Sequence, residues 1–307
     1  MKRPLVKGSS VYQIGGQPCH RAEELVFVLK SITAKQRSQG KSILIQPSEI
    51  KKFFDKDMIE DVILACQKRG VDPKARKLWF KLNAETRIRV RTGVGMSKFC
   101  HVGAVVGQGT IGGALGSQEV LDEGISEQFA PGGGDELNYG EVPMAPLMFQ
   151  DDLIHSTEGV KQARIASLKL NRVLKQLNWS LLEDKTVCLV MGTPKQKQLI
   201  KVELEKTPLM CGEIQMKLVD KVKWLGQMLS TDGLADSVDA TVTAREGKIE
   251  AGSLKIAQII SDWRTHLVGG METARFLWES CCVPSLTHGS GNWTQISTKT
   301  KKKLIGI

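Results

Sequence analysis

The sequence predicts an α/β (α+β) fold followed by an all-helical C-terminal region. Short apolar runs bounded by polar residues indicate buried strands, and they lie at residues 42–45, 145–149, 153–154 and 186–191. Amphipathic segments separate these runs along the chain. Beyond Asp232-Gly233 the composition turns helical, over 238–263 and 272–282, so we expect a domain boundary near 231–235.

The amphipathic segments have apolar residues at helical spacing and begin or end at characteristic residues. Gly40 and Gly70 lie where two of them end, and Pro73 opens a third. A fourth follows a glycine-rich turn at 105–113, where glycines permit close backbone approach and a helix N-terminus favours an anion. No lysine follows this turn, so it is not a P-loop. The predicted helices cover residues 21–37, 57–68, 74–82, 114–125 and 159–177.

Length and composition are ordinary for a globular protein: 307 residues, of which 41% are hydrophobic and 25% charged. No apolar stretch approaches the roughly 18 residues that span a bilayer, and residues 1–4 lack the apolar run of a signal peptide. We therefore expect an intracellular protein, nuclear or cytoplasmic, that is neither secreted nor transmembrane.

The formal net charge is +10, which favours a polyanionic partner such as nucleic acid. The alternative is a basic protein that its lysines keep in solution. The seven cysteines and five histidines are dispersed, without a C-x-x-C pair. They are expected to be reduced thiols, mostly in cores, and no zinc site is expected.

Residues 86–92 alternate between polar and apolar side chains, as a strand does. Arg87, Arg89 and Arg91 would share one face, with Ile88 and Val90 on the other. Three guanidinium groups in a row would suit a phosphate backbone. The alternative is an exposed strand whose polar face happens to be basic.

Phe149-Gln150-Asp151-Asp152 places two adjacent carboxylates at a turn between two short apolar strands. An acid pair there is costly to desolvate unless a cation offsets its charge, although a solvated turn is an equal alternative. Two-metal phosphoryl transfer needs carboxylates that converge from different strands. The chain offers Glu49, which follows the apolar run at 42–45.

The order of these motifs resembles the reverse transcriptase of non-LTR (LINE-type) retrotransposons, from about residue 17 to the end of the chain. Four motifs carry the resemblance: the aromatic-x-Asp-Asp turn at 149–152, Gln108-Gly109 with Ser117 downstream, Lys185, and Trp224-Leu225-Gly226. The resemblance implies a right-hand polymerase. Its palm, with an antiparallel sheet, would cover 41–232. A remnant of the fingers or connecting helix would precede it at 1–40, and an all-α thumb with the start of a C-terminal linker would follow at 233–307.

The same resemblance implies an RNA-directed DNA polymerase, a nucleotidyltransferase that extends a DNA primer with deoxynucleoside triphosphates on an RNA template. Two Mg²⁺ ions, or Mn²⁺ in their place, would be bound by Asp151, Asp152 and Glu49. Lys185 would protonate the leaving pyrophosphate, unless it is simply a surface lysine. No membrane partner is expected.

The resemblance implies roles for four further groups of residues. Gln108, with Gly109, would contact the incoming nucleotide, and residues 224–226 (Trp224, Leu225 and Gly226) would grip the primer end. Phe54 would exclude a ribose 2′-hydroxyl, or would be a core aromatic. The strand arginines would touch the template backbone.

Three departures from the family pattern bear on activity. Glu49 stands where the family has aspartate, the finger strands that carry basic residues for the triphosphate are expected to be absent, and Gly112-Gly113 replaces a usual Ser-Pro. A carboxylate displaced by about 1 Å can lower a rate about a hundredfold. We therefore expect a fragment of an element's reading frame with weak or no activity. Two alternatives stay open: a catalytically dead, basic RNA- or DNA-binding remnant, and a fragment that does not fold stably.

Overall fold

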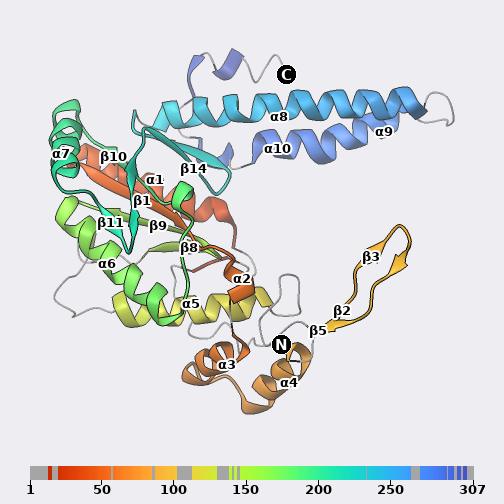
Figure 1. Ribbon diagram of the computed structural model, residues 1–307. Helices are drawn as coiled ribbons and strands as arrows, with labels where there is room; N and C mark the ends of the chain where they lie inside the picture. The colour runs from red at the N-terminus through yellow and green to blue at the C-terminus, as the bar shows by residue number, and fades with distance from the viewer. Residues whose placement is uncertain are drawn as a thin grey trace.

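The computed structural model describes residues 13–15, 20–56, 58–84, 87–101, 113–129, 138–139, 142–143, 146–232, 234–263, 270–288, 290–293, 296–298 and 300–302. Within them the chain is mixed α/β. Figure 1 shows a central sheet covered by helices, the C-terminal helices beyond it, and a separate hairpin that extends from the body. The predicted α/β class is therefore confirmed.

The central sheet has five strands. In spatial order they are β13 (Lys217–Leu218), β10 (Val187–Met191), β1 (Ile43–Glu49), β9 (Asp152–Thr157) and β8 (Leu147–Phe149). Neighbouring strands are antiparallel except β10 and β13, which run parallel at one edge. The sheet is thus antiparallel, as predicted, apart from that edge pair.

The central strand β1 is longer than the sequence predicts, because it continues through Pro47 to Glu49. Proline has no N–H to donate, and it is tolerated where a strand lacks a neighbour on one side. The pairing of β1 with β10 covers only Ile43 to Ile45, whereas its pairing with β9 continues to Glu49. Pro47 therefore lies where β1 has one neighbour, and the extension carries Glu49 to the acid turn.

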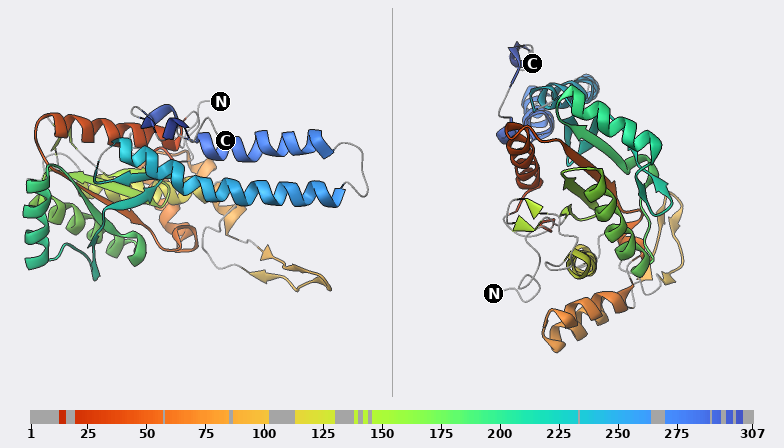
Figure 2. Two further views of the ribbon diagram at one scale, coloured as in Figure 1. Left: turned by 90° about the horizontal axis from the view of Figure 1, so that it is seen from above. Right: turned by 90° about the vertical axis from the view of Figure 1, so that its left-hand side faces the viewer.

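Two apolar cores lie on the two faces of the sheet. Ile43 and Ile45 of β1 pack on one face, and Leu44 packs on the other. This alternation is the two-residue period of a strand. The first face is covered by α1 (Ala22–Ser38) and by the hairpin of β14 (Lys221–Trp224) and β15 (Gln227–Ser230). The second is covered by α3 (Ile59–Lys68), α5 (Gly113–Phe129), α6 (Val160–Gln176) and α7 (Pro194–Lys206), and Figure 2 shows the two layers edge-on.

All five predicted helices are present with small shifts at their ends, the third of them as α4 (Pro73–Asn83). α7 was not predicted, although its start is well marked in the sequence. Thr193 Oγ1 accepts the Gln196 N–H, and the Gln196 side chain accepts the Thr193 N–H, which is a capping box. The remaining short elements are α2 (Phe53–Lys56), β6 (Asn138–Tyr139), β7 (Val142–Pro143), β11 (Met210–Cys211), β12 (Ile214–Gln215) and the 3₁₀ turns Glu183–Lys185 and Ser290–Asn292.

The C-terminal region is helical, as predicted. α8 (Leu234–Trp263) is followed by α9 (Gly270–Leu277), a π-helical turn (Trp278–Cys282) and α10 (Val283–Thr287). Figure 1 shows the later helices returning along α8. Among the helices that the structure describes, none combines the length and the apolar character needed to cross a bilayer.

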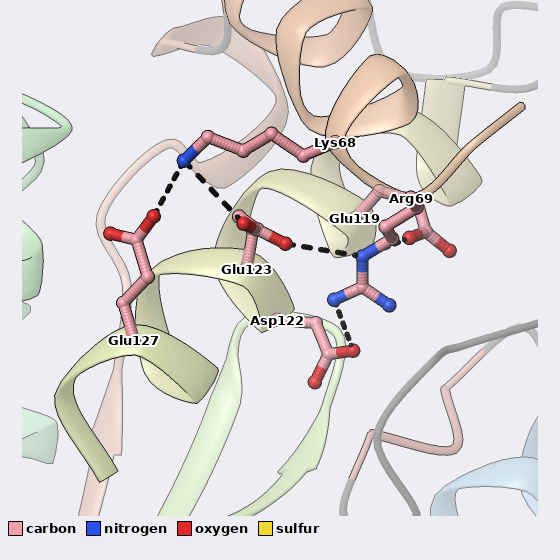
Figure 3. Close-up of polar contacts among 6 residues, drawn as sticks. All are labelled: Lys68, Arg69, Glu119, Asp122, Glu123 and Glu127. Carbon is pink, nitrogen blue, oxygen red and sulfur yellow. Dashed lines mark hydrogen bonds and ion pairs between the residues drawn. The ribbon is translucent and has the colours of Figure 1, made fainter. Parts of the chain in front are cut away.

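A network of ion pairs joins the end of α3 to α5 (Figure 3). The Arg69 guanidinium lies 3.0 Å from a Glu119 carboxylate oxygen and donates a hydrogen bond of 2.7 Å to Asp122. The side chains of Arg69 and Asp122 are 9% and 1% exposed. Lys68 pairs with Glu123 and Glu127 nearer the surface. The network therefore buries charge between two helices of one core.

The arginine-bearing segment differs from its prediction as one alternating strand. It forms two short strands, β2 (Arg87–Ile88) and β3 (Arg91–Thr92), which pair with β5 (Cys100–His101) and β4 (Gly95–Met96). Opposite the two residues between β2 and β3 lie three residues, 97–99, so the ladder contains one extra residue. Val90 is 57% exposed, so the predicted apolar face is not buried at this residue.

Candidate functional site

The acid turn connects β8 to β9. Phe149 pairs with Asp152, which leaves Gln150 and Asp151 as the two turn residues. Gln150 has a φ of 59°, a left-handed conformation that is uncommon for a residue with a side chain. The buried Gln13 supports this turn, because its side-chain oxygen accepts the Gln150 N–H at 3.2 Å. Gln13 was not predicted, because no local sequence pattern indicates a contact with Gln150, which lies 137 positions away.

Strand register brings the predicted partner acid to this turn. Glu49 is the last residue of β1 and lies directly opposite Asp152, the first residue of β9. The Ile50 N–H donates to the Asp151 carbonyl at 3.1 Å, and the Leu182 N–H donates to the Glu49 carbonyl at 2.9 Å. The backbone around both acids is therefore fixed by hydrogen bonds.

Lys185 lies at the same place, at the end of a 3₁₀ turn just before β10. Its ammonium group forms an ion pair and a hydrogen bond with the Glu49 carboxylate. That hydrogen bond raises the pKa of Lys185, which keeps the ammonium charged. Glu49 and Lys185, which are 136 positions apart, thus form a charged pair at the predicted site.

Electrostatics in the site disfavour a full set of carboxylate charges. Burial, followed by repulsion from Asp151 and Glu49, raises the pKa of Asp152 to about 6. Burial, followed by repulsion from Glu49, also raises the pKa of Asp151. Lys185 opposes both shifts without cancelling them. A cation bound beside these acids would therefore relieve repulsion that already exists.

The predicted primer-grip residues form the tip of the β14–β15 hairpin. Trp224 pairs with Gln227, so Leu225 and Gly226 are a two-residue turn with φ values of 44° and 75°. Such turns need positive φ at both central positions, which glycine adopts freely and leucine adopts at a cost. Trp224 is buried, with 3% of its surface exposed, in the core under α1. The turn is thus anchored by an aromatic side chain and carries backbone strain at Leu225.

A cavity of about 490 Å³ joins the acids to this hairpin. Its walls come from four separate parts of the chain: the end of β1, the start of β9, the 3₁₀ turn and the hairpin tip. The lining includes Glu49, Asp152, Asp184, Lys185 and residues 222–226. Predicted residues from three of the four motifs, together with Glu49, therefore share one open pocket.

Two buried cations, from two different helices, hold the hairpin. The Lys30 ammonium of α1 donates to the Gln227 side chain at 3.1 Å, and burial lowers the pKa of Lys30 to about 8. The Arg245 guanidinium of α8 donates to the Gly226 carbonyl at 2.6 Å and to the His288 carbonyl at 2.7 Å. Neither residue was predicted, because their spacing along the chain shows no pattern.

The other predicted site residues lie elsewhere. Phe54 is half-buried and packs edge-to-face on Phe53, with ring centroids 5.1 Å apart. It therefore contributes to a core, which was the alternative to a role beside the nucleotide. Gln108 and Gly109 lie outside the described residues. Arg87, Arg89 and Arg91 are exposed on the separate hairpin, which Figure 1 shows apart from the sheet.

The donor chemistry of the acid turn suits a hard cation. Mg²⁺ prefers carboxylate oxygens and is commonly held by one or two carboxylates together with substrate phosphates. Among the residues that the structure describes, no group of three or more His, Cys, Asp or Glu side chains is gathered closely enough to hold a metal ion. A divalent cation would therefore be held by Asp152 and its neighbour Asp151. Glu49 could join them only if its ion pair with Lys185 were broken.

Comparisons with known proteins leave the family unassigned. No family model matches the chain, and no curated protein matches it. Among solved structures it is similar to apo telomerase from Candida tropicalis, truncated from its C-terminal domain, with 10% identity and a TM-score of 0.44 over 72% of this chain and 39% of that one. It is also similar to telomerase from Candida albicans in complex with a TWJ fragment of telomeric RNA, with 9% identity and a TM-score of 0.47 over 90% of this chain and 48% of that one. The chain thus spans less than half the length of either neighbour.

The raised pKa of Asp152 predicts a pH-dependent gain in stability from Asp152→Asn. Between the ordinary value of 3.8 and about 6, the folded protein keeps a proton that the unfolded chain releases. Stability from this group therefore falls as pH rises through that window, and the cost is complete above pH 6. We expect Asp152→Asn to raise the free energy of unfolding by about 1 kcal/mol at pH 7.5, after allowance for its partial exposure, and by nothing near pH 3.5.

Chemical denaturation at the two pH values measures this difference. Asp184→Asn is the matched control, because Asp184 is exposed and lines the same cavity. An equal gain at both pH values would show that the Asp152 carboxylate carries no electrostatic cost.

Proposed function

We propose that this chain is the reverse transcriptase domain of a non-LTR retrotransposon, with an RNA-directed DNA polymerase activity that Glu49 weakens. The cavity that joins Glu49, Asp152 and Lys185 to residues 224–226 is the observation that carries the proposal. The cavity supports the resemblance that the order of the motifs carries, because motifs far apart in the chain line one pocket. In this proposal residues 1–40 are a fingers remnant, 41–232 the palm and 233–307 the thumb with the start of a linker.

The proposed reaction is the attack of a primer 3′-hydroxyl on the α-phosphorus of a deoxynucleoside triphosphate, with pyrophosphate as the leaving group. Asp151 and Asp152, with Glu49, would hold two Mg²⁺ ions or Mn²⁺. Such ions stabilise the charge that develops on the attacking and leaving oxygens. Lys185, whose pKa is raised by its hydrogen bond to Glu49, would deliver a proton to the leaving pyrophosphate.

The hairpin tip would fix the primer end. Arg245 donates a hydrogen bond to the backbone of its turn, and the buried Trp224 side chain anchors the hairpin in the core. The part of the cavity wall that the hairpin forms is therefore held at two points. A rigid wall favours the orientation that in-line attack requires. Gln108, with Gly109, is proposed to contact the nucleotide, and Phe54 to exclude a 2′-hydroxyl if its ring turns from Phe53 to the nucleotide.

The test is Asp151→Asn in purified protein, assayed for extension of oligo(dT) on poly(rA) with dTTP and Mg²⁺. We expect the rate to fall by about a hundredfold or more, because cation binding at such sites is worth several kcal/mol of transition-state stabilisation. Binding of Mn²⁺, followed by electron paramagnetic resonance, should weaken in the same variant. Asp61→Asn on the exposed surface of α3 is the control. Unchanged extension in Asp151→Asn would refute the assignment of the acid turn.

The pairing of Glu49 with Lys185 favours a second candidate function, binding of RNA or DNA without catalysis. A carboxylate neutralised by an ammonium group is a poorer cation ligand than a free one. This candidate predicts strongly salt-dependent binding of a primer–template and no nucleotide incorporation. Extension above background by the unmodified protein would exclude it.

A further inference from the structure

The hairpin at residues 87–101 has a one-sided composition. It contains four cations, Arg87, Arg89, Arg91 and Lys98, and no aspartate or glutamate. Each of these four residues is exposed. Figures 1 and 2 show the hairpin extending from the end of α4, away from the sheet. Its charge therefore faces solvent, where it favours a polyanion.

The same hairpin exposes apolar side chains along its length. Val90 is 57% exposed, Val94 100%, Met96 52% and Phe99 58%. A soluble surface seldom gathers apolar groups in this way unless they contact a partner. Val90 lies between Arg89 and Arg91, and Phe99 directly follows Lys98, so a ligand of this surface would offer both negative charge and apolar faces.

Arg89 and Phe99 form a stacked pair at the extra residue of the ladder. The guanidinium carbon of Arg89 lies 4.5 Å from the Phe99 ring centroid, and its Nε donates to the Ser97 carbonyl at 3.4 Å. Ser97 also exchanges two hydrogen bonds with Val90, each of 2.9 Å. The extra residue thus fixes an aromatic ring and a planar cation side by side on an exposed surface.

We propose that residues 87–101 bind a single-stranded polynucleotide, with Arg89 and Phe99 as a platform for an unpaired base. Unpaired bases present apolar π-faces beside a chain of phosphates, which is the combination that this surface requires. Arg87, Arg91 and Lys98 contact the phosphates on either side. This site extends the proposed function by naming where the template binds. It rests on the proposed function only in taking an RNA template as the strand that is bound.

Other anionic partners fit the surface less well. A duplex hides its base faces, so it would use the cations and leave Phe99 without a contact. An acidic peptide added to a free edge would need a regular ladder, which the extra residue at 97–99 interrupts. A membrane surface would favour large apolar groups at the tip, whereas the tip is Gly93-Val94 and Phe99 lies along the side.

Fluorescence anisotropy of the 307-residue protein tests the proposal, with labelled U15, dT15 and a 15-base-pair RNA duplex in EDTA. We expect U15 and dT15 to bind more tightly than the duplex. Phe99→Ala should weaken single-strand binding by roughly 5- to 150-fold, as expected for one lost stacking contact, and should leave the salt dependence unchanged. Arg87→Gln with Arg91→Gln should instead flatten the slope of log K against log salt by about 1.4, at roughly 0.7 per phosphate.

Phe27→Ala and Arg37→Gln in α1 are matched controls, since Phe27 is 55% exposed and Arg37 is also exposed. Equal losses for single strand and duplex in Phe99→Ala, or no loss, would overturn the base platform. Competition by anionic lipid vesicles but not by U15 would identify a membrane site and also overturn it. EDTA removes divalent cations, so single-strand binding is measured without any contribution from metal at the acid turn. An inactive acid turn would therefore leave this result unchanged, and a failure of the polymerase proposal can be told apart from a failure of the base platform.

Discussion

Replacing Arg69 with methionine is expected to lower the free energy of unfolding by about 3–5 kcal/mol. The guanidinium is the buried cation that faces Glu119 and Asp122, whose side chains are 8% and 1% exposed. Its removal leaves carboxylates without compensation in the interface between α3 and α5. Urea denaturation followed by circular dichroism measures the change.

Lys68→Met is the matched control, because Lys68 pairs with acids of the same helix while 44% of its own side chain is exposed. We expect this variant to cost no more than about 1 kcal/mol. Adding Asp122→Asn to Arg69→Met should recover part of the loss, because it removes one of the unpaired charges. Equal costs for Arg69→Met and Lys68→Met would mean that the network contributes no more than surface ion pairs do.

Glu49→Asp is expected to raise the rate of primer extension on the order of a hundredfold. Aspartate keeps the charge but is one methylene shorter, which moves the carboxylate by about 1 Å and withdraws it from Lys185. Under the proposed function, the acid would then be available to a cation beside Asp152. Single-turnover extension with a saturating primer–template measures the chemical step separately from binding.

Glu49→Gln removes the charge and should abolish extension, so the pair of variants separates charge from position. Glu183→Asp is the control for a shortened acid, because Glu183 is exposed in the adjacent 3₁₀ turn. A fall in rate with Glu49→Asp, or no change, would show that side-chain length at position 49 does not limit the reaction.

Periodicity predicted the elements whose pattern reflects burial. α6 was predicted at 159–177 and is found at Val160–Gln176, since its apolar residues face the core at helical spacing. β1 was predicted too short, because Pro47 reads as a strand end unless the missing neighbour is known. The single strand predicted at 86–92 was wrong for a related reason: alternation does not reveal that its partner carries an extra residue.

The candidate site was predictable only in part. The sequence named Glu49, Asp152, Lys185 and residues 224–226, and the structure brings them to one cavity. It could not indicate that Lys185 pairs with Glu49, because both residues are polar at the ends of strands and their contact depends on the register of the sheet. Gln13, Lys30 and Arg245 were missed because each acts through hydrogen bonds to residues far away in the sequence. The metal and nucleotide roles stay predictions.

The hairpin beside the acid pocket is hydrogen-bonded both to an N-terminal helix and to the C-terminal helices. Lys30 ties it to the first helix, and Arg245 ties it to α8 and, through the His288 carbonyl, to the segment after α10. The pocket is consequently not a module that can be excised with the sheet. Any shortened derivative that ends before α8, such as one made for crystallisation or screening, would lose the hydrogen bonds from Arg245. Its pocket would then have a differently held hairpin wall.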